Sequence, residues 1–430
     1  MSTVTSEARE GDFSGWSADD TILAIRHHKL TVREHISEVL GRAERAKSLN
    51  AFINLLPDQA LAAADKIDAA IAKGEPLPPL AGLAIVVKDN INMAGFPNTG
   101  GTNALLTACP SNTAPSLERL TAADTGGSSR IPAALTGIAG YRPSVGDGGE
   151  QRRYHDDHGV LPISHTRDTV GPMGRSVADV ALLDSIISGR PRAEPAQLRG
   201  VRLGIPPVLW AGLDKELEKM VLHAQHVLQD AGIELVRDDI PDLLELDSTV
   251  GPPISLYEAR TDIPAYLSGS GIDGVRLEDI LDGISSPDVK PIFSSIVHGD
   301  FGHEYRQVMA VRRPALQKLY ADYFQQHRVD AILFPTTILP ATPIDIIHGS
   351  GNVSINGGPQ MEAFAAYTRN TGPASNAGIP GLSIPVGKTA AGLPVGIEID
   401  GPLGSDDRLL SLGLAMEKVL GCLPGPEPWA

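Results

Sequence analysis

Apolar residues in the first 75 positions recur with the period of an α-helix. Between Val32 and Ala43 they fall three or four residues apart, which places them on one helical face. A third helix is expected to begin near Pro57, because proline suits the first helical turn, and to end at Gly74. Two pairs have the spacing of capping boxes: Ser17 with Asp20, and Thr31 with Glu34. The pattern predicts an N-terminal helical segment over residues 1–75.

The pattern changes at Leu80–Val87, an unbroken apolar run that follows a proline-rich connector. Short, β-branched runs of this kind are typical of a strand buried on both faces of a sheet. Lys88, Asp89 and Asn90 follow directly, at the end of the strand where open α/β sheets place their functional sites. We therefore expect a central strand here, with Lys88 at its carboxyl end.

From Arg199 onward, predicted strands and helices alternate, which indicates an α/β fold. The predicted strands are Val201–Ile205, 232–236, Ala331–Phe334, Leu382–Val386 and Val395–Ile399, and the predicted helices are 213–231, 304–326 and Asp406–Leu420. Pro314 is expected to kink or split the second of these helices. Residues 240–300 are rich in Pro, Gly and Asp and poorly periodic, so we interpret them as a surface insertion or a cap over the substrate.

Composition narrows the class of protein. The chain has 430 residues, 42% of them hydrophobic, which is enough for a substantial core. Its formal net charge of −16 disfavours nucleic acid and anionic membrane surfaces as partners. Cys109 and Cys422 are the only cysteines, so we expect neither a disulfide framework nor a cysteine-based metal site. Because no leader-like segment and no long apolar run is found, a cytoplasmic protein is expected.

The loop Asp124–Ala133 (Asp-Thr-Gly-Gly-Ser-Ser-Arg-Ile-Pro-Ala) carries the clearest chemical signal. Glycine permits conformations that point consecutive backbone N–H groups into one concavity. Ser128, at the end of that nest, would have its hydroxyl beside donors able to stabilise an oxyanion. This is the layout of an acyl-transfer site, although an isolated Gly-Gly-Ser-Ser is more often a simple turn. A phosphate-binding loop is disfavoured, because no Gly-Lys-Ser/Thr follows.

A serine nucleophile needs a base, and the sequence offers two candidates. Ser164, His165 and Asp168 have the residue types of a triad, but triad members normally come from separated segments, so this alternative is disfavoured. Lys88 is favoured, because burial lowers the pKa of a lysine and a neutral lysine can accept the proton of a serine. The ordinary alternative for a lysine at this position is a solvated charge or an ion pair, with Asp89 as the neighbouring partner.

His155-Asp-Asp-His158 also has metal-ligand residue types at tight spacing. It lies in a charged loop flanked by glycines, so we interpret it as a solvated turn that could rim the substrate entrance rather than as a metal site. No metal and no cofactor are expected.

Several motifs together resemble the amidase signature family over nearly the whole chain. They are Leu83–Asn90, Asp124–Ala134, Gly137–Pro143, Pro162–Met173, Arg175–Asp179, Phe334–Thr337 and Asn376–Pro385. The resemblance implies a single large α/β domain over residues 1–430, with a mixed central sheet flanked by helices. It also implies hydrolysis of amides by a Ser–cis-Ser–Lys triad, without metal. The motif around Ile163–Asp168 resembles the mandelamide and indoleacetamide hydrolase branch.

Roles can be carried over from the family by position. Ser128 would be the acylated nucleophile and Lys88 the ultimate base. The backbone N–H groups of Thr125, Gly126 and Gly127, with that of Ser128, would form the oxyanion hole. The side chains expected to support the loop are those of Asp124 and Arg130, and Arg130 could instead meet a polar group of the substrate. Residues 367–373 are expected to lie close to the site.

The chain departs from the family at one place. In relatives, the middle serine of the triad lies in a second Gly-Ser-rich stretch between the lysine and the nucleophile, and Ser128 follows Lys88 here by only 40 residues. The family segment with a core strand, a helix and this relay serine is therefore expected to be missing near residues 120–124. Either this deletion is real, or the sequence has lost an internal segment; the second explanation is favoured, because removing a central strand would expose its neighbours' backbone groups and open the core. If the deletion is real, the candidates to replace the relay are Ser111, Ser116 and Ser129.

Two functions remain as hypotheses. The first is hydrolysis of a small aromatic or arylaliphatic primary amide to acid and ammonia through a Ser128 acyl-enzyme. The alternative is a catalytically impaired amidase-like binding protein that lacks the relay serine. The expected partner is a small-molecule amide, with no nucleic acid and no membrane, and a homodimer is left open.

Overall fold

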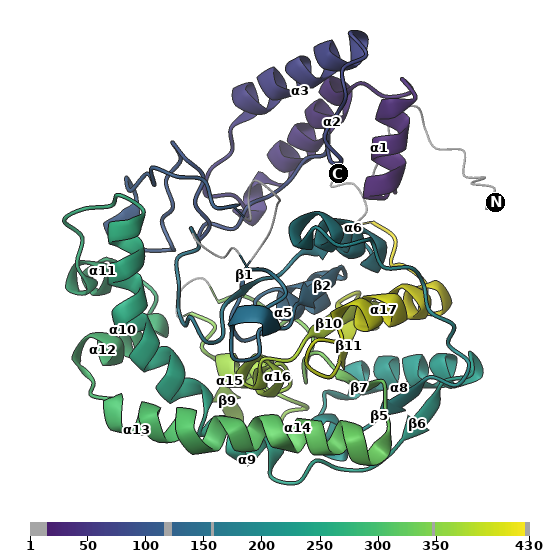
Figure 1. The fold of residues 1–430 in the computed structure, drawn as a ribbon, viewed down its shortest axis with the longest axis vertical. Coiled ribbons are helices and arrows are strands. Elements are labelled where there is room, and N and C mark those ends of the chain that lie inside the picture. The colour runs from purple at the N-terminus through teal and green to yellow at the C-terminus, as the bar shows by residue number, and fades with distance from the viewer. Residues whose placement is uncertain (1–14, 116–122, 156–158, 346–348, 426–430) are drawn as a thin grey trace. The chain divides into compact units, whose positions relative to one another are not determined.

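The computed structural model describes residues 15–115, 123–155, 159–345 and 349–425 (Figure 1). The chain divides into two compact units, and each is described by itself. The first unit comprises Met1–Val86 with Pro424–Ala430, and the second comprises Val87–Leu423. No helix among the described residues is both long enough and apolar enough to cross a bilayer.

The first unit is helical, as the sequence predicts. Its helices are α1 (Ala18–Arg26), α2 (Val32–Arg45), the 3-10 turn η1 (Lys47–Leu49) and α3 (Pro57–Ala72). Both expected capping boxes form at the starts of α1 and α2. The apolar faces of the three α-helices meet around Ile25, Val32 and Ala64, which are all buried. Gly82 packs so closely on this cluster that a Cβ there would lie 2.7 Å from Cδ1 of Ile25.

The strand expected at Leu80–Val87 does not form, so this prediction is wrong. The segment after Leu83 has no regular secondary structure up to Lys88. Ile85 and Val86 are exposed by 39% and 72%. A strand persists only where a neighbour pairs its backbone N–H and C=O groups. No described segment pairs with these residues as a ladder partner.

The second unit is built on a seven-stranded mixed sheet in the order β4-β2-β10-β11-β7-β5-β6. Its strands are β2 (Ala139–Arg142), β4 (Met173–Gly174), β5 (Arg202–Gly204), β6 (Glu234–Val236), β7 (Ala331–Pro335), β10 (Gly381–Lys388) and β11 (Pro394–Asp400). β5 runs parallel to β6 and β7, and the other neighbours are antiparallel. The α/β class and the five predicted strands after residue 199 are confirmed.

Helices cover both faces of this sheet, and β7 shows how the core divides. Ala331 and Leu333 join an apolar cluster with α6 (Val177–Ser188), α8 (Lys215–Asp230) and α17 (Asp406–Leu420). The alternate residues Ile332 and Phe334 join a second cluster with α14 (Arg313–His327) and α16 (Gly372–Ala377). Successive side chains of a strand point to opposite faces, so the sheet is buried on both. α17 has the bounds that the sequence predicts.

Residues 240–300, interpreted from the sequence as a surface insertion or a cap, contain four helices. They are α9 (Leu243–Ser248), α10 (Gly251–Gly269), α11 (Leu277–Gly283) and α12 (Val289–His298). α10 begins with two prolines, contains Pro264 and buries Glu258 on its packed face. These residues interrupt the apolar period, which explains why the helices escape sequence analysis.

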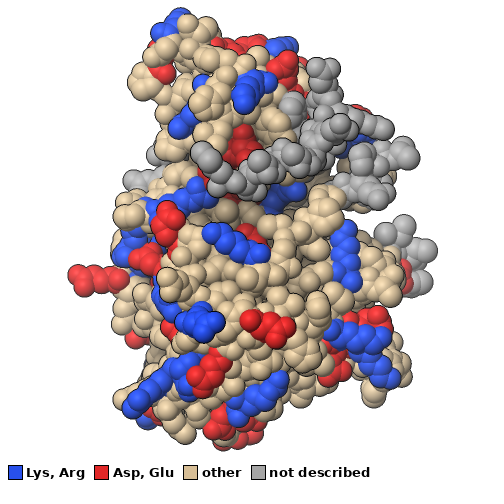
Figure 2. All heavy atoms as spheres, turned by 90° about the vertical axis from the view of Figure 1, so that its right-hand side faces the viewer, with Lys and Arg blue, Asp and Glu red and all other residues tan. Residues whose placement is uncertain are grey.

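The predicted helix at 304–326 is interrupted as expected. It comprises α13 (Gly302–Gln307), a π-helical turn at Val308–Arg312, and α14, whose first turn holds Pro314. The remaining elements are η2 (Asn103–Leu105), β1 (Ala123–Asp124), α5 (Arg130–Thr136), η3 (Gly149–Gln151), β3 (Thr169–Val170), α7 (Pro207–Trp210), β8 (Asn352–Ser354), β9 (Gln360–Glu362) and α15 (Ala363–Thr368). Basic and acidic side chains are interspersed on the face shown in Figure 2.

Candidate active site

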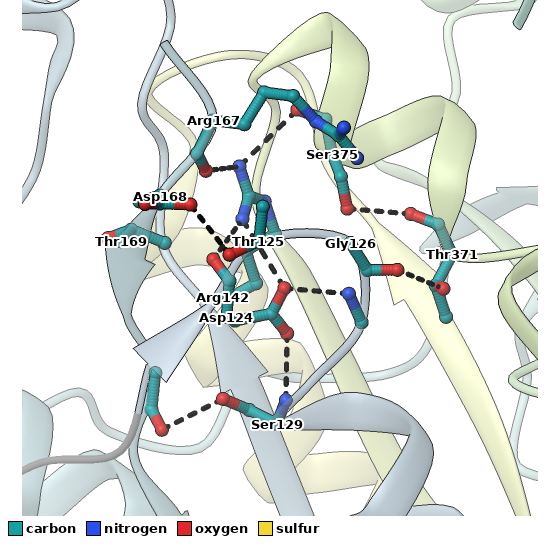
Figure 3. Close-up of polar contacts among 12 residues, drawn as sticks. Asp124, Thr125, Gly126, Ser129, Arg142, Arg167, Asp168, Thr169, Thr371 and Ser375 are labelled. Carbon is teal, nitrogen blue, oxygen red and sulfur yellow. Dashed lines mark hydrogen bonds and ion pairs between the residues drawn. The ribbon is translucent and has the colours of Figure 1, made fainter. Parts of the chain in front are cut away.

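The nucleophile loop, defined here as Asp124–Arg130, joins β1 to α5 (Figure 3). The Asp124 carboxylate accepts hydrogen bonds from the N–H of Gly127 at 2.9 Å and of Ser129 at 3.0 Å, which bends the chain around it. Gly127 has φ +131°, and a Cβ there would lie 2.5 Å from both Ile131 and Thr371. Only glycine fits this position. The bend leaves Ser128 exposed between two buried neighbours.

Two arginines hold Asp124 in its ionised form. Nε of Arg130 lies 3.2 Å from one carboxylate oxygen, and Nη1 of Arg142 lies 3.3 Å from the other. Arg142 also donates to the backbone carbonyl of Asp124 at 2.7 Å. Burial would raise the pKa of Asp124, but the two guanidinium groups hold it well below its usual range. The acceptor that shapes the loop is therefore permanently charged near neutral pH.

Arg130 faces inward rather than toward a substrate. Its guanidinium donates to Oε1 of Glu398 at 2.5 Å and to Oγ of Ser375 at 2.7 Å, in addition to Asp124. No part of its side chain is exposed. Of the two roles considered for this residue, the geometry corresponds to support of the loop.

A second set of side chains fixes the outer part of the loop. Oγ1 of Thr125 donates to Asp168 at 2.6 Å, and Oγ1 of Thr371 donates to the carbonyl oxygen of Gly126 at 2.7 Å. Thr371 belongs to the segment 367–373, which thus lies against the loop as expected. Sequence reasoning did not assign this role to Asp168, Thr371 or Arg142. The motif that contains Arg142, Gly137–Pro143, was the available signal for it.

The backbone N–H groups of the loop differ in what they bind. The N–H of Gly127 is already donated to Asp124. Within the part of the chain that the structure describes, the N–H groups of Gly126 and Ser128 have no hydrogen-bond acceptor. Donors of this kind beside an exposed hydroxyl can stabilise negative charge that develops on a bound carbonyl oxygen.

Lys88 lies within electrostatic range of the loop. Burial of its ammonium group lowers the pKa of Lys88, while the charges of Asp124 and Asp168 act in the opposite direction. By solvent-accessible surface, Lys88 as a whole residue is exposed. The net shift of the pKa is downward, so a larger fraction of Lys88 carries a neutral amine than in an ordinary solvated lysine.

The disfavoured histidine triad does not assemble. Oγ of Ser164 donates to Glu258 at 2.6 Å, and Nδ1 of His165 lies 2.9 Å from Asp262 on α10. Asp168 accepts instead from Thr125. The hydrogen bond with Asp262 raises the pKa of His165, as expected for a histidine that fixes a loop to a helix.

The other serines considered as relays have different partners. Ser129 is buried, and its Oγ donates to the carbonyl of Gly171 at 3.0 Å. Oγ of Ser111 donates to the carbonyl of Ser270 at 3.2 Å. Ser116 lies outside the described residues, as do residues 156–158 of the histidine-containing loop.

The sequence model of the family described as Amidase matches residues 34–125 and 121–410. This chain belongs to the amidase family. The two matched stretches meet at residues 121–125, between Lys88 and Ser128.

Relatives and solved structures agree with this assignment. A mandelamide hydrolase from Pseudomonas putida is 36% identical, and the alignment covers 94% of this chain and 91% of the relative. An indoleacetamide hydrolase from Agrobacterium vitis is 34% identical, and the alignment covers 96% of this chain and 98% of the relative. The aligned span with the first, 484 positions, exceeds the 430 residues of this chain, so the relative has residues where this chain has none.

Among solved structures, one titled as an amidase is 25% identical, covers 94% of this chain and all of its own, and has a TM-score of 0.80. A peptide amidase from Stenotrophomonas maltophilia, 22% identical, covers 97% of this chain and 99% of its own with a TM-score of 0.79. The second likeness concerns the fold alone.

Proposed function

We propose that this amidase hydrolyses a carboxylic amide with Ser128 as the nucleophile. The observation that carries the proposal is the local geometry of the loop. The side chains of Asp124, Ser129 and Arg130 are buried and hydrogen-bonded, whereas Ser128 is exposed beside two N–H groups that have no acceptor among the described residues. In the proposed reaction, Oγ of Ser128 attacks the amide carbonyl, and the N–H groups of Gly126 and Ser128 stabilise the oxyanion. Thr125 and Gly127 line the same turn.

Lys88 is the proposed base. Its lowered pKa increases the fraction of neutral amine, which accepts the proton of Ser128 as the C–O bond forms and returns it to the leaving nitrogen as the C–N bond breaks. Water then attacks the acyl-enzyme, the acid leaves, and Ser128 recovers its proton.

We infer that the segment with the family's relay serine is absent from this chain at residues 121–125. The meeting of the two family matches there and the longer aligned span of the relative support this inference. The proton then passes between Ser128 and Lys88 without that serine.

The proposed substrate is a small aromatic or arylaliphatic primary amide. This part of the proposal rests on the relatives whose names refer to mandelamide and indoleacetamide. Release of ammonia from phenylacetamide, mandelamide and indole-3-acetamide, compared with aliphatic amides of similar length, tests the preference for an aromatic group.

The test of the nucleophile is covalent labelling with a fluorophosphonate, followed by peptide mass spectrometry. We expect one adduct on Ser128 in the wild-type chain and none in Ser128→Ala. Ser111→Ala is the matched control, because that serine is exposed and bonded to a distant carbonyl, and it should label as the wild type does. Absence of any adduct that depends on Ser128 would exclude the proposed enzyme and favour a binding protein.

A further inference from the structure

Two carboxyl groups lie buried in the centre of the sheet beneath the nucleophile loop. Glu398 and Asp400 are two residues apart on β11, so both side chains point to the same face. Neither has any exposed surface, and their carboxyl groups lie within hydrogen-bond reach of each other. Oε1 of Glu398 accepts from Arg130. Oε2 of Glu398 and both oxygens of Asp400 have no donor among the described residues.

The backbone of β10 closes over this pair. Gly381 lies opposite Asp400 in the antiparallel ladder. A Cβ at Gly381 would lie 2.5 Å from Oδ1 of Asp400, 3.0 Å from Oε1 of Glu398 and 3.2 Å from Nη1 of Arg130. Because Gly381 has no side chain, the backbone of β10 can pack directly against the carboxyl groups of Glu398 and Asp400 and the guanidinium group of Arg130.

The charges around the pair do not balance if every group is ionised. Three buried carboxylates, those of Asp124, Glu398 and Asp400, face the guanidinium groups of Arg130 and Arg142. From α14, Tyr320 approaches with a buried hydroxyl that has no hydrogen-bond partner, and Asp247 acts on that tyrosine from α9. A buried charge without a counter-charge is strongly destabilising, whereas one proton shared by Glu398 and Asp400 brings the three carboxyl groups and two guanidinium groups to zero net charge.

We propose that Glu398 and Asp400 hold one proton between them and act as a single negative charge that positions Arg130 under the nucleophile loop. The proton converts two opposed acceptors into a donor and an acceptor. Burial raises the pKa of both carboxyl groups, and that of Asp400 lies well above its usual range because the charge of Glu398 adds to the effect; at Glu398 the contact with Arg130 opposes the rise. Asp400 is therefore the principal carrier of the proton.

The pair acts on the loop through Arg130, so both carboxyl residues are positioning residues. Arg130 connects Glu398 to Asp124, and Asp124 holds the N–H groups of Gly127 and Ser129. The effect on catalysis rests on the proposed role of Ser128, but the protonation itself does not. A measurement of stability against pH tests it even if the chain has no amidase activity.

The experiment compares equilibrium urea unfolding of wild type, Asp400→Asn and Asp273→Asn between about pH 5 and pH 8. The folded wild type keeps a proton that the unfolded chain releases above about pH 3.9, the ordinary pKa of an aspartate. Its ratio of folded to unfolded molecules should therefore fall, relative to Asp400→Asn, by about tenfold for each pH unit. Asp273 is an exposed aspartate, and its variant should keep the wild-type slope.

Glu398→Gln supplies the contrast. It removes the anion that faces Arg130, so we expect lower stability over the whole pH range and a loss of kcat/KM of at least about tenfold. Asp400→Asn keeps that anion and supplies an amide donor in place of the shared proton, so it should retain kcat/KM near neutral pH. Equal slopes in wild type and Asp400→Asn, or equal losses of activity in the two variants, would overturn the proposal.

Two measurements on the wild type protect the test against a variant that fails to fold. Infrared spectroscopy at about pH 8 should show the carbonyl stretch of a protonated carboxyl group, at a pH where Asp247, with a pKa of about 6, is ionised. Stability should also be equal in sodium, potassium and choline chloride. Absence of the band, or a stability that depends on the cation, would show that a bound cation rather than a proton balances the pair.

Discussion

The two groups proposed to carry the chemistry belong to regions that are built differently. In the nucleophile loop, buried charges fix the backbone, and Asp124 and Arg130 have no exposed side-chain surface. The segment before Lys88 is apolar but exposed, with Val86 exposed by 72%, and it forms no strand. The loop is held by specific polar contacts. Residues 83–88, here called the lysine segment, have no strand partner among the described residues, although their apolar, β-branched composition is typical of a strand. The loop that holds the proposed nucleophile Ser128 is therefore preorganised by buried polar contacts, whereas the residues that precede the proposed base Lys88 are not.

The largest effect on stability is expected for a substitution in the nucleophile loop, the region held by buried charges. Arg130→Met removes the cation between Asp124 and Glu398, so Glu398 loses its ion-pair partner and Asp124 keeps only Arg142. Loss of one partner from a buried ionic network costs about 3–5 kcal/mol. The free energy of unfolding, measured in urea at neutral pH, should fall by this amount.

The control for this variant is Arg276→Met, because Arg276 forms an exposed ion pair with Asp279 on α11 and its loss should leave stability nearly unchanged. Equal effects of the two substitutions would show that the buried network does not determine the stability of the loop.

The contrast between the two regions also explains what the sequence could predict. Local signals are sufficient for the capped helices and for α17, because a capping side chain lies within one turn of the backbone group it binds. The partner of Arg130, by contrast, is Glu398, 268 residues away. No local pattern specifies such a contact, so the alternative of a substrate contact stayed open for Arg130.

The strand predicted at Leu80–Val87 failed for a related reason. Its apolar, β-branched composition is a local property, but a strand also requires a neighbour that can be far away in the chain. The turn that exposes Ser128, the proposed nucleophile, was recognisable, because the glycines that admit a sharp turn and the exposed serine are contiguous in Gly126–Ser128. The contacts that fix this turn, such as the hydrogen bond from Thr371 to the carbonyl oxygen of Gly126, come from segments far away in the sequence.

The second largest effect is expected in the pH dependence of kcat/KM, which tests the other region through the pKa of Lys88. A lysine base acts when neutral, so kcat/KM should rise with pH through a pKa below the value of about 10.4 for a solvated lysine. Asp168→Asn removes a negative charge that raises the pKa of Lys88, and should therefore move this rise to lower pH.

Asp273→Asn, which removes an exposed aspartate, should leave the profile in place. Lys88→Met should abolish the rise together with most of the activity. A profile that keeps its shape in Lys88→Met would assign the base to another group.

The smallest expected effect concerns the lysine segment itself. Because Val86 is exposed, Val86→Thr should change the free energy of unfolding by no more than about 0.5 kcal/mol. Val353, which is 4% exposed on β8 (Asn352–Ser354), is the matched site, and the same substitution there buries an additional hydroxyl and should cost about 1–3 kcal/mol. If Val86→Thr costs as much as Val353→Thr, the segment is covered in solution, for instance by a second copy of the chain. The lysine segment would then be as constrained as the nucleophile loop, and a concentration-dependent unfolding midpoint would identify the second copy as the cause.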